Sequence, residues 1–450
     1  MRITDALKLF NEGVNALARV TSNGFRLDMD YLAGLEPRIK TRIDELSCKI
    51  TEETEIGRMW KARYGSSINL SSGNQFKDVL KKDVGFTQFK LTEKGGESAD
   101  SEVIGKLPRQ FASQYLQYKQ MEQLYGLYVE PLLIEVSNKG FVHANFPLHR
   151  VKTYRGSCHS PNIQQVPSRN REMMRLIRSC YIPREPGRVL VDMDLKGAEC
   201  SIGACIHGDP AMLAYMTDDS LDMHRDGACL VYMLDKERIS KPIRNACKGD
   251  FTFAEFYGAN FHTVAPRLWE YVLDDEFKTA DGEKVSSHLS SKGIEDLDGF
   301  IHHIQKVESD FWGKMFPGYS QWKEDVWQQY LIDGFAKVAT GFVLTLESRK
   351  EQILNAPIQG PSFHFLLKML IGMQERMIKR NMKSLIIAQI HDAITFDAVP
   401  EEIEDIKSLY KEVHDDIHKQ WKWLRIPIRA EMEIGEIGGS WAEMTEVGLI

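Results

Sequence analysis

The sequence has no long apolar run and no secretory leader. None of its uninterrupted apolar stretches approaches the ~20 residues that a membrane-spanning helix needs. The first residues, Met1–Asp5, do not lead into the apolar core of a signal peptide. Membrane partners and export are therefore not expected, and the predicted location is the cytoplasm.

Cysteine is scarce and shows no pairing pattern. The seven cysteines are an odd number, and no two have the CxxC or zinc-ligand spacing. They predict reduced thiols and not a disulfide framework. With 43% hydrophobic and 27% charged residues, the 450-residue chain has the composition of an ordinary globular protein, long enough for two or three domains.

Positive charge is in deficit overall but is concentrated in one segment. The formal net charge of −7 argues against a nucleic-acid partner. Residues 150–188, however, contain nine Lys or Arg residues and two Glu residues. Such a segment in an acidic chain favours a phosphate-binding surface. A solvated face is the alternative, although such faces usually mix charges of both signs.

The spacing of apolar residues predicts a mostly helical chain with a few strands. The expected helices cover residues 1–20, 29–63 (one long helix or a pair), about 108–128, 362–381 (beginning just after Gly360-Pro361) and 400–421. Apolar, branched runs predict strands at 132–148, 189–196 and 385–397. The polar and acidic residues 273–299, with a hairpin-type turn at Asp281-Gly282, predict a surface insertion.

Two of the predicted strands end in a carboxylate. One strand delivers Asp194, and the other delivers Asp392. Two aspartates presented by two buried strands are suited to a pair of divalent metals, which can activate a hydroxyl group and stabilise a leaving phosphate oxygen. For either residue alone, an Asp that caps the turn after its strand is the competing interpretation.

A helix that carries cationic and aromatic side chains separates the two carboxylates in the sequence. Its notable residues are Arg244, Lys248, Phe253 and Tyr257. These side chains suit a triphosphate and a base, so the order of the three segments suggests nucleotidyl transfer. Core packing is the alternative for the aromatic residues, above all for Phe253, because Phe251 and Phe256 lie nearby.

Six segments in a fixed order resemble family A DNA polymerases, the bacterial DNA polymerase I group with its phage and organelle relatives. The similarity runs from about residue 24 to residue 441. The segments are Leu70–Leu80 (thumb), Thr153–Pro167 (T-G-R…P-N-L-Q-N-I-P), Asp194–Glu199 (D-Y-S-Q-I-E, motif A), Arg244–Gly258 (motif B), Asn355–Gly360 (N-A-P-M-Q-G) and His391-Asp392 (H-D-E, motif C). Any one match would be weak, but six in order make chance a poor explanation.

The resemblance implies an α+β fold shaped like a right hand, with a palm built on an antiparallel sheet, fingers and a helical thumb. The expected divisions are an N-terminal helix and lead-in (1–29), the thumb (30–130), the palm (131–212 and 346–450) and the fingers (213–345, with an insertion at about 273–299). It also implies a template-directed DNA polymerase that extends a primer 3′-hydroxyl with dNTPs.

In this interpretation Asp194 and Asp392 hold two Mg²⁺ ions, for which Mn²⁺ can substitute. Magnesium prefers hard oxygen ligands and keeps several waters. The family has a Glu after the motif C Asp, where this chain has Ala393. Asp192 lies two residues before Asp194 on the same strand face. It is a candidate third carboxylate, and a solvent-facing or supporting Asp is the alternative.

The resemblance assigns the incoming dNTP to the fingers helix. Arg244 and Lys248 would contact the phosphates, with His224 nearby, or His224 is an ordinary surface histidine. Phe253 would stack on the base and sugar, Tyr257 would lie near the template base, and Glu199 would exclude a 2′-hydroxyl. The family spaces its Lys and aromatic residue by four, whereas Lys248 and Phe253 are five apart. A π-bulge could absorb the extra residue.

The remaining candidates would contact the primer-template DNA. Arg, Asn and Gln donors can check pair geometry in the minor groove, because its acceptors are nearly the same for every correct pair. The candidates are Arg155, Asn162, Gln164, Asn355, Gln359 and His391, of which Arg155 and Gln359 are favoured. The other Arg residues of 169–188 are expected to touch phosphates.

Three further expectations concern what the chain is and lacks. The short segment before the thumb predicts no proofreading exonuclease or 5′ nuclease in this polypeptide, and separate processivity or nuclease subunits are conceivable partners. The compact size and divergent motifs suggest a viral or mobile-element replicase, which would act in the cytoplasm of a bacterial host. A catalytically weakened DNA-binding relative is the alternative function, and a single-subunit RNA polymerase is a less favoured one.

Overall fold

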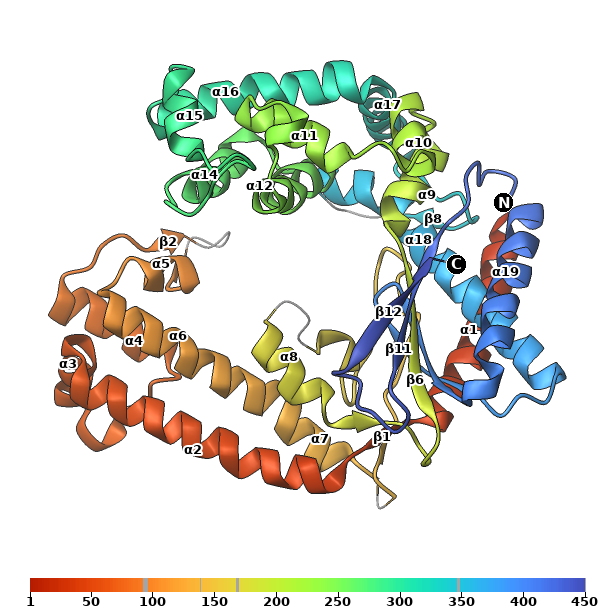
Figure 1. Ribbon diagram of the computed structural model, residues 1–450, viewed down its shortest axis with the longest axis horizontal. Helices are drawn as coiled ribbons and strands as arrows, with labels where there is room; N and C mark the ends of the chain where they lie inside the picture. The colour runs from red at the N-terminus through yellow and green to blue at the C-terminus, as the bar shows by residue number, and fades with distance from the viewer. Residues whose placement is uncertain (92–95, 138, 167–169, 346–348, 450) are drawn as a thin grey trace.

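The computed structural model describes the chain except residues 92–95, 138, 167–169, 346–348 and 450. Three regions surround an open centre (Figure 1). The α2–α7 region projects to one side, the helices α10–α17 lie above, and a sheet with flanking helices closes the other side. This is the expected arrangement of thumb, fingers and palm. None of the helices in the described ranges is both long and apolar enough to cross a membrane.

The palm contains a five-stranded antiparallel sheet in the order β12-β11-β6-β10-β9. Its strands are β6 (Val189–Leu195), β9 (Leu385–Ile390), β10 (Ala393–Ala398), β11 (Ala430–Gly435) and β12 (Met444–Leu449). The central β6 is buried at nearly every position, which its run of branched apolar residues predicts. Because β6 pairs with both β10 and β11, residues far apart in sequence meet along it.

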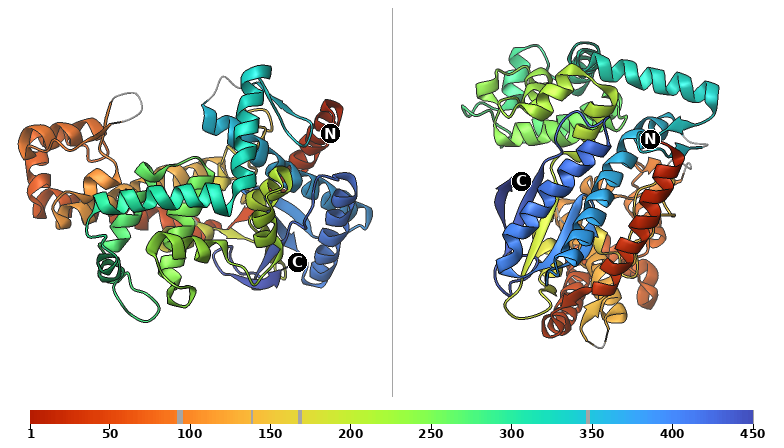
Figure 2. Two further views of the ribbon diagram at one scale, coloured as in Figure 1. Left: turned by 90° about the horizontal axis from the view of Figure 1, so that it is seen from above. Right: turned by 90° about the vertical axis from the view of Figure 1, so that its right-hand side faces the viewer.

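Three long helices pack together on the palm, as the end-on view of Figure 2 shows. They are α1 (Ile3–Asn23), α18 (Lys350–Lys379) and α19 (Ile403–Gln420). The side-chain amide of Asn23 donates to the carbonyl of Ile386 on β9 at 2.8 Å, and that of Gln374 on α18 donates to the carbonyl of Ala16 at 3.3 Å. The N-terminal helix is therefore part of the palm.

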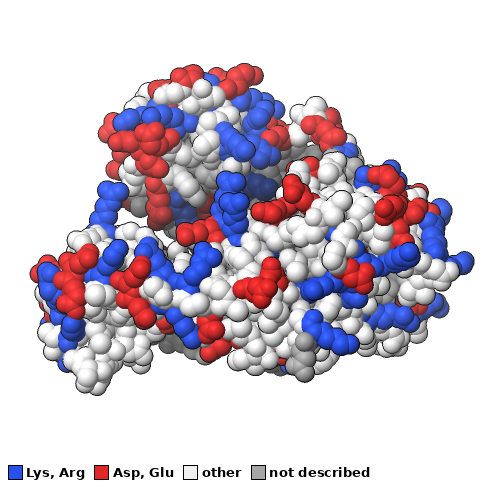
Figure 3. Space-filling view, turned by 60° about the horizontal axis from the view of Figure 1, so that its bottom comes forward, with Lys and Arg blue, Asp and Glu red and all other residues white. Residues whose placement is uncertain are grey.

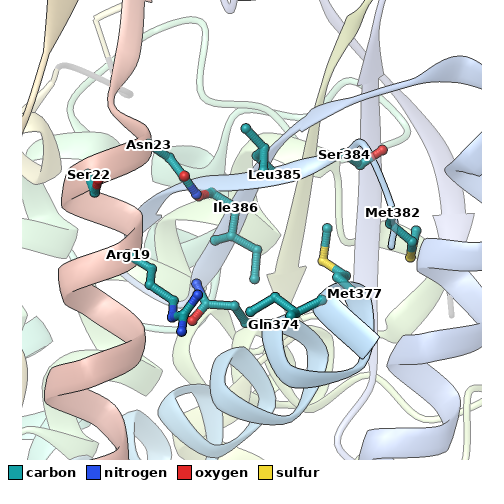
Figure 4. Close-up of a pocket in the computed structure, with 10 residues that line it drawn as sticks. Arg19, Ser22, Asn23, Gln374, Met377, Met382, Ser384, Leu385 and Ile386 are labelled. Atoms are coloured by element: carbon teal, nitrogen blue, oxygen red, sulfur yellow. The ribbon is translucent and has the colours of Figure 1, made fainter. Parts of the chain in front are cut away.

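A small cavity of about 230 Å³ lies between α1, α18 and β9. Figure 4 shows Arg19 and Asn23 reaching toward Gln374 and Ile386 across this seam. None of the residues predicted for catalysis or for nucleotide and DNA contacts lines the cavity. It belongs to the packing of the N-terminal helix on the palm.

The thumb is a helical unit with its own core. Its main helices are α2 (Met29–Glu53), α3 (Glu55–Tyr64), α4 (Gly73–Val79), α6 (Arg109–Leu124) and α7 (Glu130–Glu135). The expected long helix or pair at 29–63 is a pair, and the Thr54 hydroxyl caps the second helix by accepting from the backbone N–H of Gly57. Four aromatic side chains pack at the centre: Trp60, Phe76, Phe111 and Tyr115.

The fingers are also helical. They comprise α10 (Pro210–Thr217), α11 (Met223–Tyr232), α12 (Lys241–Ala246), a π-helix (Cys247–Phe253), α13 (Ala254–Phe256), α14 (Phe261–Val272), α15 (Val285–Ser291), α16 (Leu297–Asp310) and α17 (Pro317–Asp333). Within 273–299, Lys278 and Lys284 bridge across a tight turn in which Gly282 has φ +90°. The predicted hairpin-type turn is confirmed, and α15 follows it.

Two secondary-structure predictions are wrong. Residues 132–148 are not mainly strands: α7 runs to Glu135, and among the described residues of this range β4 (Phe141–Val142) is the one strand that follows. The helix expected at 362–381 begins twelve residues earlier, at Lys350, with Pro357 and Pro361 inside it. Both prolines are buried in the palm, so tertiary packing outweighs the backbone hydrogen bonds that they cannot donate.

Candidate active site

Asp194 and Asp392 lie side by side at one end of the palm sheet. Strands β9 and β10 form a hairpin whose two-residue turn is His391-Asp392, with His391 at φ 52°. Asp194 on β6 pairs directly with Ala393, the next residue. The backbone N–H of Leu195 donates to the carbonyl of Asp392 at 3.0 Å. Strand pairing therefore brings together two motifs that are almost two hundred residues apart.

The two carboxylates repel each other. Burial, followed by the negative charge of Asp392, raises the pKa of Asp194 to about 7. Burial also raises the pKa of Asp392, while Arg155 and His391 act in the opposite direction. Two neighbouring carboxylates with raised pKa values form a site that a cation would stabilise.

A cavity of about 600 Å³ opens above these carboxylates, and it collects most of the predicted site. The predicted residues that line it are Arg155, Asp194, Glu199, Phe253, Tyr257, Asn355, Gln359, His391 and Asp392. The hydroxyl of Tyr257 donates to Glu199 at 2.8 Å, and the Arg155 guanidinium lies 3.6 Å from the same carboxylate. Burial raises the pKa of Glu199. Its carboxylate therefore meets Tyr257 and Arg155 in a part of the cavity that is shielded from solvent.

A second cavity, of about 390 Å³, adjoins the first and shares Phe253 with it. Arg244, Lys248 and His224 line this cavity, as the assignment to a triphosphate requires. Arg244 is held by Asp222, to which its Nε donates at 2.5 Å. Burial, together with the charges of Arg244 and Lys248, lowers the pKa of His224 to about 4, which keeps its imidazole neutral at pH 7.

The irregular spacing in the fingers helix is absorbed as expected. The π-helix Cys247–Phe253 spans the positions between Lys248 and Phe253. One extra residue per turn returns both side chains to the same face, and the Lys248 ammonium lies 5.8 Å from the Phe253 ring centre. The assignment of Lys248 to this face therefore has structural support.

Comparison with known proteins decides the family. The family model described as DNA polymerase family A matches residues 30–274 and 316–443. The chain belongs to DNA polymerase family A. The unmatched residues 275–315 overlap the predicted insertion in the fingers.

Individual relatives agree with this assignment. The thermostable DNA polymerase I of Thermus thermophilus is 25% identical over 427 residues, covering 93% of this chain and 46% of that protein. DNA polymerase I of Bacillus subtilis is 25% identical, covering 91% and 44%. The chain thus spans less than half the length of these curated relatives. A solved structure, the POL domain of Pol1 from M. smegmatis in complex with DNA primer-template and dNTP, has a TM-score of 0.75 at 21% identity and covers 96% of this chain and 70% of that one.

The carboxylate pair of this family A chain fits a divalent metal of the magnesium type. Within the described residues, no group of three or more His, Cys, Asp or Glu side chains is gathered to hold an ion. Magnesium commonly takes one or two protein carboxylates and completes its shell with water and substrate phosphates. Asp194 and Asp392 meet that requirement because both face the cavity.

The hypothesis that Asp192 supplies a third metal carboxylate is not supported. Asp192 is buried, and its Oδ2 accepts a hydrogen bond from the indole N–H of Trp441 at 2.7 Å. It does not line the cavity. The guanidinium of Arg178 lies 4.2 Å from the Trp441 ring centre, and its positive charge acts on Asp192. The carboxylate therefore fixes Trp441 against the middle of β6.

Two of the predicted primer-template contacts do not line the cavity. The side-chain amide of Gln164 donates to the Gln389 side chain at 2.7 Å and to its carbonyl at 3.1 Å. The side-chain oxygen of Asn162 is buried without a hydrogen-bond partner. Arg155, Asn355, Gln359 and His391 do face the cavity.

The basic segment 150–188 is only partly a phosphate-facing surface. Arg188 forms an ion pair with the buried Asp397 at 2.9 Å, and Arg184 donates to the carbonyl of Asn23 at 2.6 Å. With Arg178 beside Trp441, these cations neutralise or cap buried groups of the palm. Arg171 and Arg175 on α8 (Arg171–Arg178) remain exposed, and Arg169 lies outside the described residues. Lys and Arg side chains also border the hollow beneath the fingers (Figure 3).

Sequence reasoning missed two cations in the second cavity. Lys196 and Arg429 line it from the palm side, opposite Arg244 and Lys248. A signal for Lys196 was present, because the family motif D-Y-S-Q-I-E has Ser at that position. No local signal marks Arg429, whose place depends on the pairing of β11 with β6.

Proposed function

We propose that the chain is a template-directed DNA polymerase that extends a primer 3′-hydroxyl with dNTPs. One observation carries this proposal: the carboxylate pair faces a cavity that adjoins a second, cationic cavity, and Phe253 lines both. A nucleotide placed across Phe253 would bring its triphosphate to Arg244 and Lys248 and its α-phosphate toward Asp194 and Asp392. Membership of DNA polymerase family A supports the same reaction.

Two Mg²⁺ ions held by Asp194 and Asp392, for which Mn²⁺ can substitute, would lower the pKa of the primer 3′-hydroxyl and offset charge on the leaving pyrophosphate. The protein's own groups position the reactants. Arg244 and Lys248 place fixed positive charge where negative charge develops on the leaving group. The neutral imidazole of His224 can donate a hydrogen bond to a phosphate oxygen without adding charge.

Sugar selection is assigned to Glu199. Its carboxylate, held by Tyr257 and Arg155, stands in the wall of the cavity beside Phe253. A 2′-hydroxyl placed there would meet a fixed acceptor and its packed neighbours. This arrangement favours dNTPs over rNTPs and disfavours the single-subunit RNA polymerase alternative.

Primer-template DNA is the proposed partner. Arg155 and Gln359 line the cavity that holds the carboxylates, where their donors can reach the minor-groove edge of the terminal pair. The exposed Arg171 and Arg175 of α8 are available for phosphates, and so are Arg150 and Lys152 at the start of the basic segment. The relative solved with primer-template and dNTP has the same fold, which is consistent with this placement.

Primer extension tests the proposal directly. A labelled primer on a longer template is incubated with Mg²⁺ and either dNTPs or rNTPs. Wild type should extend it with dNTPs, and Asp194→Ala and Asp392→Ala should each abolish extension. Asp405→Ala, which removes an exposed carboxylate on α19, is the control that should retain activity. Failure of wild type to extend while it still binds the DNA would favour the catalytically weakened relative, an alternative raised by Ala393.

Three narrower expectations stay predictions. They are the viral or mobile-element origin, a location in the cytoplasm of the host, and cooperation with separate processivity or nuclease subunits. Affinity purification of the chain from its native cells, followed by mass spectrometry, would identify such subunits and the compartment in which they meet.

A further inference from the structure

Four Lys or Arg and three Asp residues line the second cavity, and one of its walls comes from the palm. Lys196 directly follows β6, and Arg429 directly precedes β11. The backbone N–H of Lys196 donates to the carbonyl of Arg429 at 2.9 Å, so the two residues are held side by side. Both line the cavity that Arg244 and Lys248 line from the fingers. A ligand in this cavity would therefore meet positive charge from two sides.

Each of these cations is now paired with a carboxylate. Lys196 lies 2.7 Å from Glu431, and Arg429 contacts Asp219. Asp219 is 80% exposed, so its ion pair is held in solvent and contributes little to stability. A phosphate carries more charge than a carboxylate and accepts several hydrogen bonds at once. It can therefore replace Asp219 as the partner of Arg429 at small cost.

The ion pair with Glu431 does not by itself explain why a lysine occupies position 196. The family motif has Ser there, and the substitution puts an ammonium group two residues from Asp194, at the boundary between the metal site and the triphosphate site. Gly197, the next residue, lines both cavities and has φ +56°, and the side chain of Lys196 is 53% exposed.

We propose that Lys196 and Arg429 bind the triphosphate of the incoming nucleotide from the palm side, opposite Arg244 and Lys248. The inference rests on the proposed function for the identity of the ligand. In this proposal Asp219 is a competitor, which pairs with Arg429 until the triphosphate displaces it. The palm residues then select for phosphate chain length, because a nucleoside monophosphate has no group that reaches them.

Nucleotide binding without chemistry tests this inference. The protein is loaded on a primer-template whose primer ends in a dideoxynucleotide, and the dissociation constants of dATP, dADP and dAMP are measured by the stability of the ternary complex. Arg429→Met and the pair Lys196→Met/Glu431→Gln should each weaken dATP binding by roughly three- to tenfold and leave dAMP unchanged. Removing Glu431 with Lys196 ensures that no unpaired carboxylate repels the nucleotide.

Asp219→Ala should tighten dATP binding by roughly two- to fivefold, because Arg429 loses its competing partner. Lys284→Met is the matched control: its ammonium pairs with Asp275 at the same 2.7 Å, but on the insertion in the fingers. It should change nothing. Arg429→Lys should retain most of the affinity, and thermal melting of each variant separates a folding defect from a weakened phosphate interaction.

Two results would overturn the inference. The first is a dissociation constant for dATP that is the same in both palm variants as in wild type. The other is an equal loss for dATP and dAMP, which would mean that the base and sugar pocket was distorted. A wild type that binds dATP tightly but never extends a primer would instead contradict the proposed function and leave the palm contacts standing.

Discussion

The ammonium group of Lys248 lies 5.8 Å from the centre of the Phe253 ring, although five positions separate the two residues. On a regular α-helix, five positions would turn the two side chains apart by about 140°. The π-helix Cys247–Phe253 restores their alignment. The proposed nucleotide site thus depends on a local departure from regular helix geometry.

Removing the extra residue should therefore be tolerated. A Cβ at Gly249 would meet nothing within 4 Å, so the bulge is open to solvent at this point. Deletion of Gly249 shortens the interval to four and allows a regular α-helix with the same alignment, so the KM for dNTPs should stay within about threefold of wild type. Insertion of one Ala after Gly249 should raise KM at least about tenfold. Steady-state primer extension measures both, and a deletion as damaging as the insertion would contradict this account.

Phe253→Tyr should raise dideoxynucleotide incorporation. Phe253 lines both cavities, and its ring packs against that of His224 in a T-shaped arrangement with a centroid separation of 5.3 Å. The family resemblance implies that a Tyr hydroxyl at this position substitutes for the missing 3′-hydroxyl of the dideoxynucleotide. The ratio of dideoxynucleotide to deoxynucleotide incorporation is the measurement, and Phe251→Tyr, in the core, is a control. An unchanged ratio would argue against this register of the fingers helix.

Glu199→Ala should increase ribonucleotide incorporation by roughly tenfold or more, because the carboxylate that stands beside the sugar is removed. The variant also frees the hydroxyl of Tyr257, which donates to Glu199 at 2.8 Å. Tyr257→Phe removes that hydrogen bond and keeps the carboxylate. If sugar selection depends on Glu199 itself, Tyr257→Phe should retain most of the discrimination. Single-nucleotide insertion with paired dNTP and rNTP substrates measures it.

Asp192→Ala should destabilise the fold and leave metal dependence unchanged. The substitution removes the acceptor of the Trp441 indole N–H and a negative charge that acts on Arg178. An unpaired buried donor and a less neutralised cation should together lower the free energy of unfolding by roughly 3 kcal/mol. Urea denaturation measures this loss. The Mg²⁺ concentration that gives half-maximal primer extension should equal that of wild type, and a large increase would restore Asp192 as a metal ligand.

Glu255 should make stability depend on pH. Burial raises the pKa of this carboxyl from 4.5 to about 7, and its Oε2 accepts from the indole N–H of Trp312 at 2.9 Å. The unfolded chain releases this proton near pH 4.5 and the folded protein near pH 7, so wild type loses stability as pH rises between those values. The loss should be on the order of 3 kcal/mol.

The variant Glu255→Gln keeps a neutral side chain at every pH and should avoid that loss. Urea denaturation of both proteins at pH 5 and pH 8 checks the prediction. The variant should be the more stable protein at pH 8, and the difference should be small at pH 5. A difference that does not change with pH would show that Glu255 does not titrate as its burial implies.

The elements that can be predicted from the sequence are those whose signal is local. Asp194 and Asp392 each close an apolar, branched run, and such runs form buried strands. The five-residue interval between Lys248 and Phe253 by itself indicates a π-bulge. Alternating or periodic patterns and short motifs depend on neighbours in the chain, so they are visible in the sequence alone.

Elements whose outcome depends on distant partners were predicted less well. The local signal of Gly360-Pro361 predicted a helix start at 362, but burial against the palm keeps Pro361, and Pro357 before it, within α18. Charge counting marked 150–188 as a phosphate surface, yet Asp397 on β10 neutralises Arg188. Asp192 resembled a metal ligand by strand alternation, and only the approach of Trp441 shows that one of its oxygens accepts a hydrogen bond inside the palm.

The sequence by itself determined the family, the pair of catalytic candidates and the proposed nucleotide-binding face of the fingers helix, because those depend on residue types at fixed local intervals. Only the tertiary structure decided which cations line the second cavity and which serve other parts of the palm. Antiparallel pairing places Arg429 beside Lys196 at the second cavity, while it commits Arg184 and Arg188 to the palm. The physical reason is that an ion pair forms between side chains adjacent in space, and strand register sets that adjacency across hundreds of residues.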